Sequence, residues 1–372
     1  MAYTTIDDPS AYFQSKTYTG SNDDTAGPGQ SLTFNGNSNL QPDMMIWSNR
    51  TSGYQRPLMD SILGTGSQLW VDANETASDH ALLTSFDSDG WTIPSSGTGS
   101  SGMNDLRYNY VGWGWKCNGG TTSTPSVSGG VSSGSSPVIQ VNTTSKFCIT
   151  RWRSNGTGAG TFTHGLGVTP EFMIFKKRGT AHWVVYHHKI DSSPEDYYIE
   201  LSTTDARVDD AGFWNDTAPT STTITVGDDT QINDDNIYTH AWIWAGVQGY
   251  SNFGSYKGNG SGTDGPFVYT GFKPAWIMIK NSETANTAWY VYDNERKTYN
   301  PNGTIFFMDA SGAEGSDQSI DLLSNGFKVK PHAAHGSGVG SVSTNESGKT
   351  MIYAAFAENP FVTSGGIPAT AS

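Results

Sequence analysis

The sequence has little charge, few cysteines and no long apolar run. Charged residues make up 15% of its 372 residues, and Cys117 and Cys148 are its two cysteines. A run of about 18 apolar residues, the length that crosses a membrane, is absent, and MAYTTIDDPS lacks the segments of a secretory leader. We therefore expect a protein made in a cytoplasm, without membrane insertion, in which two free thiols fit better than a disulfide.

A basic excess is also missing. The formal net charge is −14 and the isoelectric point about 4.8, so neither a nucleic acid nor an anionic membrane is an expected partner. No long amphipathic helical pattern occurs either. What is abundant is glycine, with 44 residues, and aromatic residues, at 12% of the chain. This composition is typical of many short strands joined by tight turns around aromatic cores.

Three related copies of one unit follow each other along the chain. In each copy a proline precedes a run of apolar residues, and an aromatic strand comes later: YVGWGW, YTHAWIW or YAAFAE. Self-similarity of this kind indicates a tandem repeat. The opening prolines are Pro42, Pro170 and Pro274, and the matched closing aromatic residues are Trp113, Trp242 and Phe356.

We predict an all-β protein of three tandem antiparallel β-sandwiches of lectin-like or jelly-roll-like type. The units are placed at residues 1–120, 138–250 and 251–372. A Ser/Gly/Thr-rich linker is placed at 121–137 because its composition is that of a flexible segment.

Individual strands can be assigned from local patterns. The unbroken apolar run 172–175 predicts a strand that is buried on both faces, whereas AWIWAG alternates and predicts a strand with one buried face. Asp89-Gly90 and Asn325-Gly326 have the chemistry of hairpin turns. The repeated tryptophans are expected in the cores: Trp113, Trp115, Trp242, Trp244 and Trp276.

Longer stretches resemble a known group of proteins. GYSNFGSYKGNGSGTDGPFVYTGFKPAWIMIKN, WYVYDNERKTYNP, LLSNGFKVK and MIYAAFAENPF resemble a repeated domain in structural proteins of tailed phages, especially phages of marine and freshwater bacteria. The resemblance is strongest over 138–361. It implies a virion component of lectin-like β architecture with no enzymatic chemistry.

From this resemblance we expect a non-enzymatic virion structural protein on the particle surface, either tail-fibre-like or a receptor-binding adhesin. The alternative is a decoration or appendage protein of the capsid or tail that binds only other virion proteins. Expected partners are other virion proteins and copies of the chain itself, with a host surface glycan or protein added in the adhesin case. No cofactor is expected.

Aromatic residues outside the repeat are the candidates for ligand contact. Tyr197, Tyr198 and Trp214 lie in segments peculiar to the middle copy, where a glycan or host contact competes with ordinary loop packing or subunit contact.

Metal and catalytic sites are not predicted. The acidic segment 227–236 lacks the spacing of the twelve-residue calcium loop, so a solvated turn is the simpler interpretation. His187 and His188 point to opposite faces of an extended segment and cannot readily share one zinc ion. No nucleophile elbow or Cys/His pattern is present.

Overall fold

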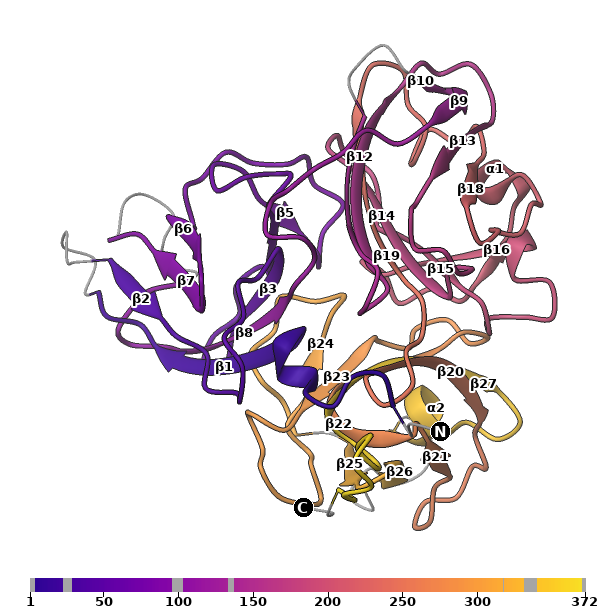
Figure 1. Cartoon of the computed structure of the whole chain (residues 1–372). Helices are drawn as coiled ribbons and strands as arrows, with labels where there is room; N and C mark the ends of the chain where they lie inside the picture. The colour runs from indigo at the N-terminus through magenta and orange to yellow at the C-terminus, as the bar shows by residue number, and fades with distance from the viewer. Residues whose placement is uncertain are drawn as a thin grey trace.

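Strands form nearly all of the regular structure. A computed structural model describes residues 4–22, 29–95, 103–132, 137–316, 318–330 and 340–369. Its strands belong to six sheets, all with antiparallel pairing, in three lobes around a common centre (Figure 1). The described helices are short: α1 (Ala211–Trp214), α2 (Gly340–Asn345) and the 3-10 helices η1 (Pro9–Ala11) and η4 (Pro194–Asp196). The prediction of an all-β protein is confirmed.

Each third of the chain contributes one large sheet. We call the regions spanned by β1–β8, β9–β19 and β20–β27 the first, second and third units. The first large sheet has the order β1–β8–β3–β4–β5: β1 (Phe13–Thr19), β3 (Met44–Asn49), β4 (Pro57–Asp60), β5 (Leu69–Trp70) and β8 (Asn109–Trp115). The third has the order β20–β27–β22–β23–β24: β20 (Ser251–Lys257), β22 (Phe272–Asn281), β23 (Tyr290–Asp293), β24 (Phe306–Phe307) and β27 (Thr350–Pro360).

The second large sheet repeats this order and adds strands at its edges. Its shared strands run β12–β19–β14–β15–β16, and the sheet has eight strands. They are β10 (Val131–Ser132), β11 (Val138–Asn142), β12 (Phe147–Ser154), β14 (Phe172–Lys177), β15 (Val184–His187), β16 (Tyr197–Glu200), β17 (Val208–Asp209) and β19 (Tyr238–Trp244).

A three-stranded sheet packs on the outer side of each large sheet. In the first unit it is β2–β7–β6: β2 (Gln30–Leu32), β6 (Ser85–Asp87) and β7 (Gly90–Ile93). In the second it is β18–β13–β9: β9 (Val127–Gly129), β13 (Gly160–Thr163) and β18 (Thr223–Val226). In the third it is β21–β26–β25: β21 (Phe267–Tyr269), β25 (Ser319–Leu323) and β26 (Gly326–Lys330). The two predicted hairpin turns join β6 to β7 and β25 to β26.

Strand register aligns the three units residue by residue. The cross-strand partners are Trp115 for Met44, Trp244 for Phe172 and Phe356 for Trp276. Pro42, Pro170 and Pro274 lie the same number of residues before Met44, Phe172 and Trp276, so the prolines are aligned as the sequence predicts. The predicted match of Phe356 with Trp113 and Trp242 is wrong by two residues. Ala354 takes that position in the third unit. The first Trp or Phe along this strand is therefore Phe356, at the next inward-facing position.

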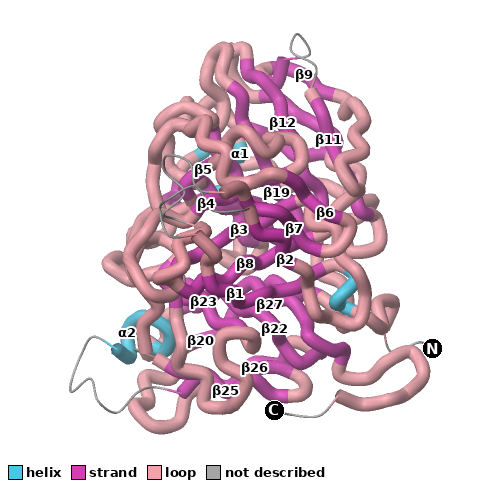
Figure 2. Tube along the Cα trace, turned by 90° about the vertical axis from the view of Figure 1, so that its left-hand side faces the viewer, coloured by secondary structure: helices cyan, strands magenta, loops and turns pink. Residues whose placement is uncertain are grey.

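The three large sheets share one core. Their faces away from the small sheets meet at the centre, and the largest hydrophobic cluster draws on all three units. In Figure 2 strands lie in the middle of the molecule and loops run over the outside. Aligned residues meet in sets: Met44, Phe172 and Trp276; Ile46, Ile174 and Met278; Trp115, Trp244 and Phe356. Because this core lies between the sheet pairs, three separate sandwiches stay a prediction.

The shared core corrects one strand prediction. β19 contains the alternating AWIW pattern that predicts one buried face, yet it is buried from Thr239 to Trp244. Trp242 and Trp244 face the shared core, while Ala241 and Ile243 face the core of the second unit. Alternation here assigns successive side chains to two different cores rather than to core and solvent. β14, predicted to be buried on both faces, is buried along its whole length.

Backbone hydrogen bonds close the three interfaces in the same way. At each interface the N–H of a residue after β5, β16 or β24 donates to the carbonyl that follows β3, β14 or β22 of a neighbouring unit. Because these positions are aligned in all three units, the chain forms a closed, threefold-like arrangement. The hydrogen bonds run from Ala77 to Arg178 (2.8 Å), from Arg207 to Ser282 (2.9 Å) and from Glu314 to Arg50 (3.1 Å).

A buried aspartate reinforces two of these interfaces. Asp60 Oδ2 accepts a hydrogen bond from the indole N–H of Trp242 (3.0 Å), and Asp293 Oδ2 accepts one from Trp113 (3.1 Å). Both carboxylates are 0% exposed. The two aspartates are aligned, as are the two tryptophans, so the first–second and third–first interfaces use the same contact.

The second–third interface replaces both partners of that contact. Ala354 stands where the other units have the tryptophan, and His187 stands where they have the aspartate. His187 Nε2 lies 3.1 Å from the carbonyl oxygen of Tyr353. Burial, and next the neighbouring His188, lower the pKa of His187 to about 3. The imidazole is therefore held neutral at this interface.

Acid is expected to weaken the protein through His187. Its pKa in the folded chain lies below the unfolded value of about 6.5, so the unfolded chain takes up the proton first. The stability that His187 contributes is present above that pH and falls by about 1.4 kcal/mol per pH unit below it. Urea unfolding at pH 7, 6 and 5 should show the advantage of the wild type over His187→Gln shrinking, with the larger loss between pH 6 and pH 5. His80→Gln, at an exposed position, should leave the slope unchanged, and parallel slopes for wild type and His187→Gln would refute the assignment.

The predicted linker 121–137 is wrong over its central part. β9 pairs with β13, and β10 pairs with β12, so this segment belongs to the sheets of the second unit. Residues 133–136 lie outside the described residues. Its glycines allow close strand contact: a Cβ on Gly130 would lie 1.8 Å from the carbonyl oxygen of Gly158. Composition alone cannot separate glycine needed for packing from glycine in a flexible chain. The unit boundaries themselves stay a prediction.

Candidate binding site between the first and third units

The chain crosses two of the three interfaces between units. Residues 116–126 lead from β8 to β9, and residues 245–250 lead from β19 to β20. In the part of the chain that the structure describes, the third–first interface is closed by noncovalent contacts. A space that is filled at the first–second interface can therefore stay open here.

The first–second interface shows what fills that space. Gln140 Nε2 donates to Ser61 Oγ (2.7 Å), and the backbone N–H of Cys117 donates to Asp43 Oδ2 (2.7 Å). By strand register, Asn294 and Ala275 occupy the positions of Ser61 and Asp43 in the third unit. Those two residues line a cavity of about 200 Å³.

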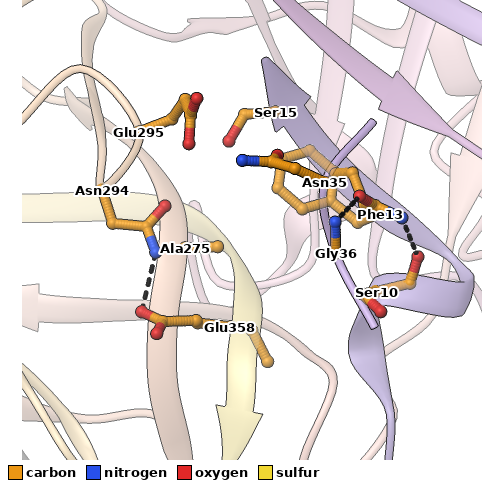
Figure 3. A pocket seen from close by; sticks show the side chains of 11 residues that line it. Ser10, Phe13, Ser15, Asn35, Gly36, Ala275, Asn294, Glu295 and Glu358 are labelled. Carbon is orange, nitrogen blue, oxygen red and sulfur yellow. Dashed lines mark hydrogen bonds between the residues drawn. The ribbon is translucent and has the colours of Figure 1, made fainter. Parts of the chain in front are cut away.

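The cavity lies between strand β1 and the ends of β23 and β27. Figure 3 shows side chains of the first unit facing those of the third across it. Its volume is below the roughly 300–1,000 Å³ of most small-molecule sites, so it suits a single sugar-sized ring or one side chain. It is lined by Ser10, Phe13, Gln14, Ser15, Asn35, Gly36, Ala275, Asn294, Glu295, Ala357 and Glu358.

Two carboxylates on the third-unit side are held in place by donors. Glu358 pairs with Lys273 (3.1 Å) and accepts from Asn294 Nδ2 (2.7 Å), as Figure 3 shows for the latter. Glu295 Oε1 accepts from the N–H (3.3 Å) and the hydroxyl (3.2 Å) of Thr17, across the interface. The cavity therefore offers fixed acceptors beside amides and hydroxyls, an arrangement that can bind a hydroxyl or amide group.

The aromatic residues predicted as ligand contacts are mostly packed. Trp214 is 1% exposed, and its indole N–H donates to the carbonyl of Tyr197 (2.9 Å). The prediction of a glycan contact through Trp214 is wrong, because its ring lies in the core of the second unit. Tyr197 is half-buried beneath the guanidinium of Arg207, and Tyr198 stacks on Phe213. Ligand contact by the two tyrosines stays a prediction, and the structure does not bring them together with Trp214 on one exposed face.

The polar clusters singled out in the sequence serve local structure. In the segment 227–236, Asp234 pairs with Lys177 (2.8 Å) and Asp229 Oδ1 accepts from the N–H of Gln231 (2.7 Å). His188 Nε2 lies 2.6 Å from the carbonyl oxygen of Phe253. Among the described residues, no group of three or more His, Cys, Asp or Glu side chains could hold a metal ion. No helix in those residues has the length and apolarity needed to cross a membrane.

Sequence reasoning missed the cavity because its two walls come from opposite ends of the chain. Ser10–Gly36 and Ala275–Glu358 meet only when the third unit closes on the first. No motif within either wall marks the site. The available signal is the repeat itself. Three consecutive copies are joined by two connecting segments, so one interface of a closed arrangement, here the third–first interface, has no connecting segment across it.

A family model described as a domain of unknown function (DUF7483) matches residues 8–360 of the chain. No curated protein and no solved structure matches.

Proposed function

Because the chain belongs to the family described as a domain of unknown function (DUF7483), its function has to be inferred from its own residues, and we propose that it is a non-enzymatic structural protein of a bacteriophage particle. In this proposal it is displayed on the particle surface and attaches the particle to its host. Its partners are other virion proteins, copies of itself and a component of the host surface.

The closed arrangement of the three units is the observation that carries this proposal. Interfaces between movable domains are small and polar, whereas these units share one aromatic core and aligned backbone hydrogen bonds. Such a body resists relative motion of its units. Rigidity of this kind suits a component that transmits load and presents surfaces, and it agrees with the resemblance of residues 138–361 to phage structural proteins.

Charge supports an external position on the particle. A protein with a net charge of −14 is repelled by packaged nucleic acid, because binding to phosphates requires a basic face. Its contacts are therefore expected with proteins or with uncharged polymers.

Immunogold electron microscopy of purified particles tests the proposal. Label at the tail tip, together with saturable binding of the free protein to host cells, would support attachment. Label over the head or tail tube without cell binding would favour the alternative, a decoration protein that binds only other virion proteins. A lack of label on intact particles that contain all their known components would overturn the particle assignment.

A further inference from the structure

Exposed aromatic side chains gather in the third unit. Among the described residues, three aromatic side chains are more than a third exposed: Phe267 (48%), Tyr269 (60%) and Tyr299 (64%). The tryptophans are buried or half-buried, as are the other described tyrosines and phenylalanines. Exposed aromatic surface that the fold does not cover marks interaction sites.

Phe267 and Tyr269 point to the same side of the small sheet. Strand β21 alternates, with Val268 buried in the core and its two neighbours exposed. Residues two apart on a strand lie about 6.5 to 7 Å from each other on one face. Phe267 is paired across the strands with Lys328, and Tyr269 with Gly326. At 60% exposure, the Tyr269 ring is accessible on this face.

The other two units show that the fold does not need aromatic residues there. Leu32 pairs with Trp91 as Val268 pairs with Phe327, so Ser31 is the first-unit equivalent of Phe267. Phe162 pairs with Ile224 in the same way, which makes Thr161 the second-unit equivalent. Both equivalents form hydroxyl pairs across strands: Ser31 with Thr92 (2.8 Å) in the first unit, and Thr161 with Ser128 (2.7 Å) of the neighbouring strand β9 in the second. Hydroxyls suit a solvated sheet face. The aromatic pair of the third unit is therefore not needed for folding and is attributed to another role.

Charges on this face are internally balanced. Lys328 pairs with Asp264, and Lys330 with Asp321 (3.2 Å). Lys328 also lowers the pKa of the Asp264 carboxyl, first through a hydrogen bond and then through its charge, so the pair stays ionised and neutral overall. A balanced face on a protein of net charge −14 complements an uncharged ligand and disfavours a polyanion.

We propose that the outer face of β21, β26 and β25 is a binding platform for a neutral polysaccharide. The apolar C–H faces of sugar rings pack on Phe267 and Tyr269, and sugar hydroxyls hydrogen-bond to the lysine and aspartate side chains beside them. Two aromatic residues that follow each other along one face of a strand can contact successive sugars of an extended polymer. The assignment rests on the proposed attachment function for the source of the glycan, which is the host surface.

The face can be converted to that of the first unit without disturbing the fold. The double variant Phe267→Ser, Tyr269→Thr introduces the residues that the first unit carries at these positions, Ser31 and Thr33. Val208→Ser is the matched control, because it removes an exposed apolar side chain (44% exposed) from the second unit. Equal thermal unfolding of the three proteins would establish that the variants are folded.

Affinity electrophoresis in native gels containing dextran, mannan, galactomannan or a soluble β-glucan tests the platform. Wild type and Val208→Ser should be retarded by at least one polymer, and the double variant should bind it at least tenfold more weakly. Absence of retardation by every polymer, or equal retardation of the double variant, would overturn the proposal. So would a wild-type oligomer that the double variant dissociates in light scattering, since the face would then join copies of the chain.

Failure of the platform and failure of the proposed function give different results. The gels use purified protein and are independent of its position on a particle. Label at the tail tip with no polysaccharide retardation would leave the particle assignment standing and discard the platform. Retardation by a polysaccharide without any label on particles would support the platform and discard the particle assignment.

Discussion

Replacing Asp293 with alanine is expected to lower the free energy of unfolding by about 3–5 kcal/mol, the usual cost of removing one partner of a buried ion pair. Asp293 and Arg296 form an ion pair in which both side chains are 0% exposed. The same carboxylate accepts from the N–H of Arg296 (2.8 Å) and from the indole of Trp113 in the first unit (3.1 Å). The variant would leave the buried guanidinium with only the more distant carboxylate of Glu314 (3.7 Å) and an interface indole without its acceptor.

Urea unfolding at pH 7 measures this effect, with Asp209→Ala as the matched control. Asp209 is an exposed carboxylate on β17, and its removal should change the free energy of unfolding by no more than about 0.5 kcal/mol. A loss below about 1 kcal/mol in Asp293→Ala would mean that the third–first interface does not depend on this contact. That result would contradict the closed arrangement at the interface that no connecting segment crosses.

Replacing Trp244 with alanine is expected to cost about 3–5 kcal/mol, the range for a large aromatic side chain removed from a core. Trp244 is 2% exposed and lies at the centre of the shared core, stacked on Phe147 with ring centroids 4.6 Å apart. It also contacts Phe172 and, across the interface, Phe356. The core there already holds a cavity of about 20 Å³, and side chains from three sheets cannot all move in to fill a larger one.

Two further variants distinguish the loss of packing in the shared core from the loss of an aromatic side chain at any position. Trp244→Phe introduces the residue of the third unit at the aligned position, Phe356, and should cost less than Trp244→Ala. Tyr269→Ala removes an exposed ring and should change the free energy of unfolding by no more than about 0.5 kcal/mol. Thermal or urea unfolding of the three proteins gives the comparison. Equal losses of unfolding free energy in Trp244→Ala and Tyr269→Ala would contradict the claim that the shared core stabilises the fold.

The repeat and its strands could be predicted because they depend on local chemistry. Prolines at the start of strands and Asp-Gly or Asn-Gly turns can be recognised in the sequence without knowing which distant segment they contact. The burial of the repeated tryptophans followed from their place in apolar strands. The two-residue error at Phe356 arose because Ala354 interrupts the aromatic pattern, and only strand pairing reveals the true position.

Closure of the three units could not be predicted, because it depends on contacts between distant segments. The backbone hydrogen bond from the N–H of Glu314 to the carbonyl of Arg50 joins residues that lie far apart in the sequence, and so does the hydrogen bond from the indole of Trp113 to Asp293. Each partner alone looks like an ordinary loop or strand residue. The candidate cavity between the first and third units was missed for the same reason.

The exposed platform, by contrast, left a signal that comparison of the copies can find. Phe267-Val268-Tyr269 is an alternating strand with aromatic residues on both sides of a core residue. Alignment with Ser31 in the first unit and Thr161 in the second would have shown the aromatic pair as an addition to the fold. Trp214 shows the opposite case: it lies outside the repeat, yet its ring fills a core.

Differential scanning calorimetry of the intact chain tests the central claim most directly, namely that the three units form one closed body around a shared core. The account predicts a single unfolding transition with a calorimetric enthalpy equal to the van't Hoff enthalpy. Two or three separate transitions, or a calorimetric enthalpy two to three times the van't Hoff value, would show units that unfold independently and would contradict the claim.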